Sequence, residues 1–227
     1  MTHAINAVLF DLDGTLLDTA LDLLQALNRL RQKFALSPLP MSALRPLVSL
    51  GSKAMIKYAF EIEEHEQQFD PLRKEFLTYY EENIVATTVF FPQIEKVLLQ
   101  LDEQNIPWGI VTNKPIKYTK KILQQLQFEK RPACTICGDT LATYKPDPAP
   151  ILYACQLLKI SPENCLYVGD AATDVIASKA AGTKSLVALY GYINSHAEAL
   201  TWEADGYINE PLELIDWLLK FPMNEPT

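Results

Sequence analysis

Val8-Leu9-Phe10-Asp11-Leu12-Asp13-Gly14-Thr15 is the stretch that decides the fold of this chain of 227 residues. An apolar strand ends here in two carboxylates one residue apart, and a glycine then turns the chain. Like charges a few ångströms apart resist joint ionisation, and a metal cation removes that difficulty. In open α/β sheets, ligands bind beyond the carboxyl ends of the strands. The stretch therefore predicts a Mg²⁺-assisted phosphoryl-transfer site; the alternative is a capped strand end that leads into a solvated turn.

The composition is that of a globular protein, with 48% apolar and 21% charged residues. A formal net charge of −8 argues against a general nucleic-acid or membrane-surface binder, because both need basic patches to meet phosphate. The chain has no run of about 18 apolar residues, and its first residues lack the pattern of a signal peptide. We therefore expect a cytoplasmic protein with a small-molecule partner, no nucleic acid and no membrane. The oligomeric state stays open.

The four cysteines favour a reducing compartment. Cys134 and Cys137 have a C-x-x-C spacing, but no second pair of ligands follows at zinc-site spacing. Their segment also resembles a strand, in which positions three apart face opposite ways. We expect Cys134, Cys137, Cys155 and Cys165 to be buried, reduced thiols.

Short apolar runs alternate with amphipathic helical patterns along most of the chain. This alternation predicts an α/β fold, with a parallel sheet and helices on both faces. The expected strands are Ala7–Phe10, Trp108–Val111, Ala133–Ile136, Leu166–Val168, Ser185–Leu189 and, near the end, Tyr207–Ile208.

The stretch from Leu16 to Thr88 breaks this rhythm, because it carries helical periodicity and no convincing strand. One apolar stripe begins at Ala20 and another at Phe69. The stretch is too long for an ordinary crossover. We therefore predict a core domain made of residues 1–15 and 89–227, with residues 16–88 inserted as an all-helical domain that covers the site.

Two further features fall at predicted strand ends. Thr112 and Asn113 follow the second strand, where Thr112 could donate a hydrogen bond to a phosphoryl oxygen; capping of the next helix is an equally good interpretation. Lys145 directly precedes Pro146 and a helix start at Asp147. A lysine held in this way can act as a fixed point charge against a phosphoryl group, whereas solvation is the usual fate of this residue type.

The segment Leu166–Asp174 repeats the opening pattern of apolar strand, glycine and carboxylates. Asp170 ends the strand, and Asp174 lies on the same helical face four residues later. Mg²⁺ takes about six oxygens and often only a few from protein. Asp11, the main-chain carbonyl of Asp13 and Asp170 could provide three of them.

Chemical roles follow from these positions. A carboxylate that touches both metal and phosphate can attack phosphorus, and we assign this role to Asp11. Asp13 is placed to protonate the leaving alkoxide and later to activate water. Mg²⁺ and Lys145 would stabilise the negative charge of the transition state.

With these four motifs in order, the chain closely resembles the haloacid dehalogenase-like hydrolase superfamily over essentially its whole length. The matching residues are Asp11-x-Asp13-Gly14-Thr15, Thr112, Lys145 and Gly169-Asp170-x-x-x-Asp174. The resemblance implies a Rossmann-like core, an aspartyl-phosphate on Asp11 and a helical cap of the C1 type. It also implies that Asp174 supports Lys145 or a metal-bound water.

Within the superfamily, Gly138–Ala142 and Lys145–Pro150 look like the phosphoglycolate phosphatase group. The segment Arg45–Met55 is similar to the one that this group uses near substrate, which implies Ser49, Gly51 and Ser52 as substrate-selecting residues, although Leu50 is bulkier than expected there. The stretch Tyr190–Ile193, Trp202 and the stretch Pro211–Leu214 are similar to a sister group, the N-acetylmuramic acid 6-phosphate phosphatases. The two groups share all catalytic residues.

The leading hypothesis is a Mg²⁺-dependent phosphomonoesterase, with 2-phosphoglycolate as the first substrate and N-acetylmuramic acid 6-phosphate or another sugar phosphate as the alternative. The presence of Asp13 disfavours a dehalogenase or a phosphonatase, since neither needs an acid for a leaving alkoxide. A phosphomutase shares the motifs. A non-catalytic interaction module with the same fold is the alternative from a different class.

Overall fold

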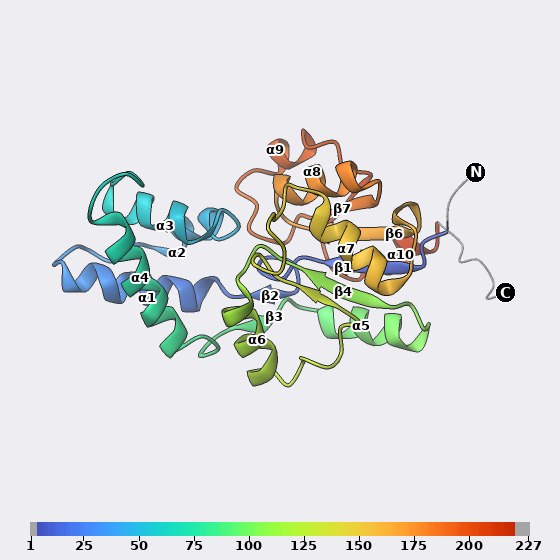
Figure 1. Ribbon diagram of the computed structural model, residues 1–227, viewed down its shortest axis with the longest axis horizontal. Helices are drawn as coiled ribbons and strands as arrows, with labels where there is room; N and C mark the ends of the chain where they lie inside the picture. Colours follow the sequence, from blue (N-terminus) through green and yellow to red (C-terminus); the bar gives the residue numbers. More distant parts are fainter. Residues whose placement is uncertain (1–3, 221–227) are drawn as a thin grey trace.

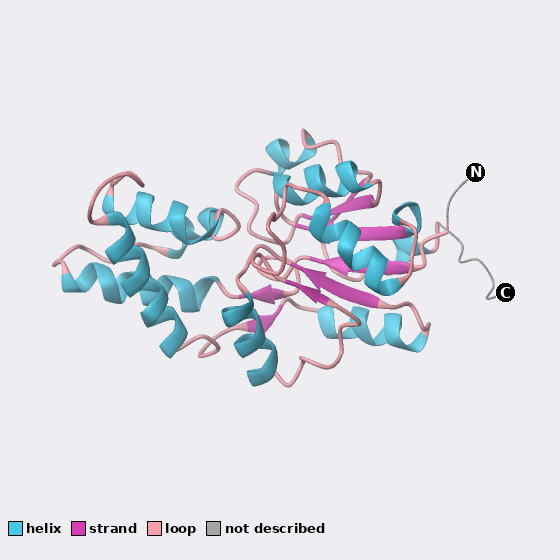
Figure 2. Cartoon of the chain, viewed as in Figure 1, coloured by secondary structure: helices cyan, strands magenta, loops and turns pink. Residues whose placement is uncertain are grey.

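Strand β1 (Ala7–Phe10) lies in the middle of a six-stranded parallel sheet, between β4 (Trp108–Val111) and β6 (Cys165–Gly169). This is the arrangement in the computed structural model, which describes residues 4–220. The remaining strands are β5 (Thr135–Ile136) beyond β4, and β7 (Lys184–Ala188) and β8 (Gly206–Ile208) beyond β6. All six run in the same direction, so their carboxyl ends meet at one edge of the sheet (Figures 1 and 2).

Helices cover both faces of this sheet because successive strand residues point to opposite sides. Val8 and Phe10 belong to an apolar cluster with α5 (Ile94–Glu103), α6 (Ile116–Gln125) and α10 (Glu213–Leu218). Ala7 and Leu9 pack instead with α7 (Ala149–Leu158) and α8 (Ala172–Ala181). The 3₁₀ turn η2 (Pro162–Asn164) leads into β6, and α9 (His196–Leu200) lies against β7. The predicted Rossmann-like α/β fold is confirmed.

Strands β1 and β4 have the limits predicted from the sequence, and the other strands differ by one or two residues. The largest difference is β5, which begins at Thr135 and not at Ala133. Only Thr135 and Ile136 pair with β4, while the N–H of Ala133 still donates to the carbonyl of Trp108 at 2.8 Å.

Four α-helices lie to one side of the sheet, beyond its carboxyl edge (Figure 1). They are α1 (Ala20–Lys33), α2 (Met41–Leu44), α3 (Gly51–Phe60) and α4 (Phe69–Glu82), and the 3₁₀ turn η1 (Arg45–Leu47) links α2 to α3. The apolar stripes predicted for this stretch are buried, including Leu27 on α1 and Phe76 on α4, apart from Leu77, which is partly buried. The segment is helical as expected, whereas its treatment as a separate domain of residues 16–88 stays a prediction.

A short antiparallel ladder closes the base of this helical segment. Strand β2 (Leu17–Asp18) pairs with β3 (Val89–Phe90), with Leu17 opposite Phe90 and Asp18 opposite Val89. The sequence analysis found no strand between Leu16 and Thr88, and β2 differs from that expectation. A strand of two residues is too short to show an alternating pattern.

All four cysteines are buried and free, as predicted. No helix within residues 4–220 has the length and apolar character needed to cross a membrane.

Candidate active site

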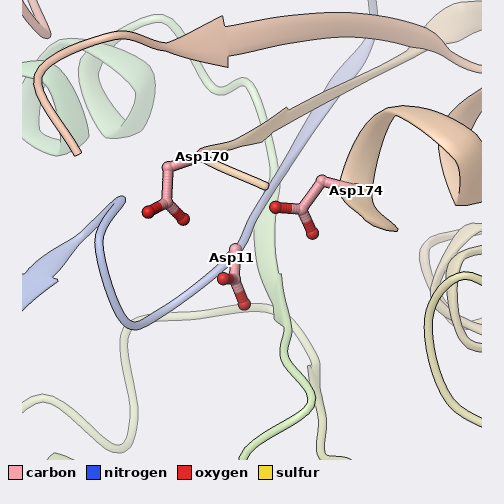
Figure 3. Close-up of side chains that lie close together, drawn as sticks. All are labelled: Asp11, Asp170 and Asp174. Atoms are coloured by element: carbon pink, nitrogen blue, oxygen red, sulfur yellow. The ribbon is translucent and has the colours of Figure 1, made fainter. Parts of the chain in front are cut away.

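Three buried carboxylates meet at the carboxyl edge of the central strands. Asp11 follows β1, Asp170 follows β6, and Asp174 lies in the first turn of α8. One oxygen from each lies within 4.8 Å of the others, and Figure 3 shows the three side chains close together. The parallel pairing of β1 with β6 explains why positions so distant in sequence meet here.

Lys145 is the cation of this cluster, and it is 2% exposed. Its Nζ lies 2.9 Å from Asp11 Oδ1 and 2.7 Å from Asp174 Oδ1. It also donates to the carbonyl of Val111 at 2.9 Å and to Tyr167 Oη at 2.6 Å. Nζ therefore has more acceptors in reach than protons to donate, which fixes the ammonium between Asp11 and Asp174.

Burial and the neighbouring charges shift the pKa values of the groups in this cluster. Burial raises the pKa of Asp11 to about 6, although the charge of Lys145 opposes the shift. Burial, together with the charges of Asp11 and Asp174, raises the pKa of Asp170 well above its usual value. Burial lowers the pKa of Lys145, but the two carboxylates outweigh it and the net shift is upward, so the ammonium stays charged.

Asp170 accepts hydrogen bonds only from neutral groups among the described residues. Its Oδ2 accepts from the N–H of Tyr192 at 2.8 Å and from the Ser49 hydroxyl at 3.1 Å, and Thr15 Oγ1 lies 3.5 Å from its Oδ1. The close packing requires glycine at position 14, where φ is +89° and a Cβ would lie 2.1 Å from Asp170 Oδ2. Within residues 4–220 the cluster thus holds three carboxylates and one ion-paired lysine, and Asp170 has no cationic partner.

The side chain of Asp13 points to a different set of partners. Lys114 Nζ contacts its two carboxylate oxygens at 3.0 and 3.1 Å, and the Thr19 hydroxyl donates to it at 2.5 Å. The side chain of Lys114 is 8% exposed and lies 4.9 Å from the ring centre of Tyr80 on α4. The third carboxylate of the cluster is therefore that of Asp174 and not that of Asp13. Asp13 could still contribute its main-chain carbonyl, which is the atom predicted as a metal ligand.

The residues that follow β4 line the same edge. Thr112 is buried, and its Oγ1 accepts from the N–H of Lys114 at 3.2 Å, which leaves the hydroxyl proton able to donate. The Asn113 amide donates to the carbonyl of Lys145 at 2.8 Å and accepts from its N–H at 3.0 Å. Asn113 therefore holds the backbone of Lys145. The first N–H of α6, on Ile116, is taken by Asp139 at 2.7 Å, so this N–H is not free for a phosphate.

The three residues predicted on the helical segment have different surroundings. Ser49 reaches the cluster through Asp170. Gly51 begins α3 with a φ of +82° and open space around its Cβ position. Ser52 turns away, since its Oγ accepts from Arg73 Nε on α4 at 2.9 Å. The structure thus brings Ser49, but not Ser52, into contact with a clustered carboxylate.

The contacts of Lys114, Tyr167 and Tyr192 are not among those predicted from the sequence. Lys114 had a usable signal, because it directly follows Thr112 and Asn113 at a strand end that already carried candidate residues. Tyr167 and Tyr192 had none, since a buried tyrosine reveals its hydroxyl partner only after folding.

The chain is similar to a known family and to known phosphatases. A family model described as haloacid dehalogenase-like hydrolase matches residues 8–188. The N-acetylmuramic acid 6-phosphate phosphatase of Pseudomonas aeruginosa is 37% identical over 201 residues, which cover 88% of this chain and 89% of the relative. The phosphoglycolate phosphatase of Xanthomonas campestris pv. campestris strain 8004 is 42% identical over 199 residues, which cover 88% of this chain and 90% of the relative.

Among solved structures, the crystal structure of a predicted phosphoglycolate phosphatase from Haemophilus somnus 129PT superposes with a TM-score of 0.83. It is 26% identical in sequence, and the match covers 94% of this chain and 97% of that one. The resemblance inferred from four short motifs is confirmed. The chain belongs to the haloacid dehalogenase-like hydrolase family and is a phosphatase of that family.

Proposed function

We propose that the protein is a Mg²⁺-dependent phosphatase that hydrolyses a small phosphate monoester through an aspartyl-phosphate on Asp11. The observation that carries this proposal is the imbalance of buried charge at the site. Three carboxylate oxygens lie within 4.8 Å of one another, and Lys145 pairs with Asp11 and Asp174 but not with Asp170. A divalent cation at this edge would offset the remaining negative charge.

The donor set suits magnesium, which is a hard cation and prefers oxygen. Asp11 and Asp170 would hold it through their carboxylates, and Asp13 through its main-chain carbonyl. When bound, the ion would polarise the phosphoryl oxygens and neutralise charge that develops on them.

Asp11 acts as the nucleophile, and Asp13 transfers the protons. The Asp11 carboxylate attacks phosphorus and forms the P–O bond of the aspartyl-phosphate, while the ester oxygen leaves. Asp13 gives a proton to that oxygen, then takes one from the water that hydrolyses the aspartyl-phosphate. Thr19 and Lys114 orient the Asp13 side chain through their contacts with its carboxylate.

Lys145 and Thr112 act on the phosphoryl group. The Lys145 ammonium, 2.9 Å from Asp11 Oδ1, supplies a fixed positive charge beside the nucleophile. Thr112 donates its free proton to a phosphoryl oxygen. Asp174 and Asn113 hold the side chain and the backbone of Lys145, and we assign them supporting roles.

We name 2-phosphoglycolate as the first substrate, because a relative with that activity in its name is 42% identical. N-acetylmuramic acid 6-phosphate is the second, supported by the relative at 37% identity. Both compounds carry a carboxylate as well as a phosphate monoester. Ser49, Gly51 and Ser52 are the positions at which we expect substitutions to change the preference between them.

The test is phosphate release from both esters and several sugar phosphates, with Mg²⁺ and with EDTA. We expect release with Mg²⁺, loss of release with EDTA, and no release from the Asp11→Asn variant. Isomerised sugar phosphate without free phosphate would indicate a mutase. An absence of any reaction would favour the non-catalytic module.

A further inference from the structure

The loop after β7 contacts both the turn after β1 and the start of the helical segment. The Tyr190 hydroxyl donates to the carbonyl of Thr15 at 3.1 Å. Gly191 packs so closely that an added Cβ would lie 2.4 Å from the carbonyl oxygen of Gly14. The N–H of Tyr192 donates to Asp170 Oδ2 at 2.8 Å. The loop thereby fixes one side of the carboxylate cluster.

The Tyr192 side chain extends from this loop to the first turn of α1. The residue is 3% exposed, and its hydroxyl accepts from the N–H groups of Thr19 at 2.7 Å and Ala20 at 3.1 Å. The same hydroxyl donates to Asp18 Oδ1 at 2.9 Å. Thr19 stands at the N-cap of α1, but its side chain bonds to Asp13 and not to its own helix. Tyr192 and Asp18, whose Oδ1 also lies 3.3 Å from the N–H of Ala20, therefore share the first N–H of this helix.

Asp18 links Tyr192 to the turn of residues 44–50, which contacts the carboxylate cluster through Ser49. Its Oδ2 accepts from Arg45 Nη1 at 3.1 Å, and the Arg45 guanidinium lies 4.9 Å from the ring centre of Tyr192. Arg45 is the first residue of η1, and Ser49 lies in the turn that follows η1. Ser49 then returns to Asp170 Oδ2. Side-chain and backbone hydrogen bonds thus link Ser49, Asp170, Tyr192, Asp18 and Arg45 in series, and the main chain from Arg45 to Ser49 closes the ring.

We propose that Tyr192 is a positioning residue, which holds the turn of residues 44–50 over Asp170 by fixing the base of the helical segment. The inference rests on the proposed function in one respect, namely that Asp170 lies beside the reacting phosphate. Burial and the charges of Asp18 and Asp13 raise the pKa of the Tyr192 phenol far above its usual value. The hydroxyl therefore stays neutral and keeps the proton that it donates to Asp18.

The test compares Tyr192→Phe with wild type by hydrogen exchange of the metal-free full chain, read by mass spectrometry. Phenylalanine keeps the ring and the backbone N–H to Asp170 but removes the hydroxyl. We expect amides in residues 17–22 and 44–52 to exchange about tenfold faster, as the loss of one buried hydrogen bond implies. Tyr190→Phe is the matched control, because it removes a hydroxyl of the same loop that does not touch Asp18, Thr19 or Ala20.

Three exchange results would overturn the proposal. They are unchanged exchange in both segments, equal acceleration by Tyr190→Phe, and acceleration spread over the whole chain, which would assign Tyr192 a general stabilising role. Arg45→Gln breaks the ring at a second point and should accelerate exchange in residues 44–52. Combined with Tyr192→Phe, it should add little, because both variants open the same ring.

Kinetics with para-nitrophenyl phosphate and Mg²⁺ give the second readout. A turn that no longer covers the bound ester should raise KM more than it lowers kcat. A fall in kcat alone would contradict a positioning role. If wild-type protein releases no phosphate from any ester, the proposed function fails, while the exchange experiment still decides the role of Tyr192.

Discussion

Lys145 shows how a charge can be kept in the interior of a protein. Burial alone would drive the ammonium toward its neutral form, and the carboxylates of Asp11 and Asp174 reverse that tendency. These carboxylates depend equally on the lysine, since each would otherwise be a buried charge without a counter-ion. The three residues therefore form one electrostatic unit, in which no member can be changed alone without cost.

Lys145→Met is expected to abolish phosphate release and to lower the free energy of unfolding by about 3–5 kcal/mol, because it leaves buried carboxylates unpaired. Urea denaturation measures the loss. Lys179→Met is the matched control, since Lys179 forms a solvent-exposed ion pair with Glu203. A loss in Lys145→Met as small as the roughly 0–1 kcal/mol typical of exposed pairs would contradict this interpretation.

Asp11→Asn and Asp13→Asn should have different consequences. The first removes the proposed nucleophile and is expected to leave no measurable turnover. The second keeps an acceptor for Lys114 and Thr19 but cannot donate or take a proton as a carboxyl group does, so kcat should fall about 10²–10⁴-fold with little change in KM. Steady-state phosphate release from each variant is the measurement. Comparable residual activity in the two variants would argue against the division of roles.

Cys134 provides a pH-dependent prediction away from the site. Burial raises the pKa of its thiol to about 11, with a smaller contribution from Cys155. The thiolate is the reactive species, so at pH 8 the folded protein should be alkylated by iodoacetamide at Cys134 far more slowly than urea-unfolded protein, and the rate should rise as the pH approaches 11. Peptide mass spectrometry resolves this cysteine from the other three. Equal rates in folded and unfolded protein would show that the thiol is not protected.

At this scale the sequence predicts acids and bases better than it predicts their partners. Asp11, Asp170 and Asp174 could be predicted because each lies just after a strand or in the first turn of a helix, where main-chain geometry fixes its position. Lys145 could be predicted because it directly precedes Pro146 in the turn before α7. The pairing of Asp13 with Lys114 could not be predicted, because it depends on where two side chains point after β1 and β4 have paired.

Among the elements, the turn between β1 and β2 and the start of α3 offer a matched pair of glycines. Gly14 and Gly51 have similar φ values of +89° and +82°. A Cβ at Gly14 would collide with Asp170, whereas Gly51 has open space around it. Alanine substitutions at the two positions therefore separate the cost of a left-handed backbone, which both share, from the cost of a steric collision, which only Gly14 has.

Gly51→Ala should lower the free energy of unfolding by about 1–2 kcal/mol through the left-handed backbone alone. Gly14→Ala should lower the free energy of unfolding by about 1–3 kcal/mol more than Gly51→Ala does, because the added methyl group must displace Asp170 or the turn itself. Thermal unfolding of both variants measures the difference. Equal losses would mean that the turn relaxes without disturbing Asp170.

The sequence predicts elements well where periodicity extends over several residues. The helices of the inserted stretch could be predicted because four or five buried positions recur on one face of α1 and of α4. Strands β2 and β3 could not, since two paired residues carry no period, and they exist because the chain ends of the helical segment are brought together.

At the scale of the whole molecule, magnesium should stabilise the folded protein. An ion that binds only the folded state raises the free energy of unfolding by about 2.7 kcal/mol when its concentration is a hundred times its Kd. This gain appears as a rise in Tm. Asp170→Asn should remove this rise. The metal-free Asp170→Asn variant should also melt above metal-free wild type, because the amide relieves the repulsion from Asp11 and Asp174. Scanning calorimetry with Mg²⁺ and with EDTA tests both statements, and an equal rise in the two proteins would exclude Asp170 as a ligand.

The ladder of β2 and β3 has a consequence for how such a molecule can change over generations. Because Leu17 pairs with Phe90 and Asp18 with Val89, the two ends of the helical segment lie side by side. The closure entropy of a loop whose ends are already joined varies only slowly with its length. Insertions, deletions and replacements between these two strands can therefore accumulate with little effect on the register of β1, β4 and β6. We expect variation in the helical segment to alter which ester is admitted, because the residues proposed to act on the phosphoryl group, Asp11, Asp13, Thr112 and Lys145, lie outside it.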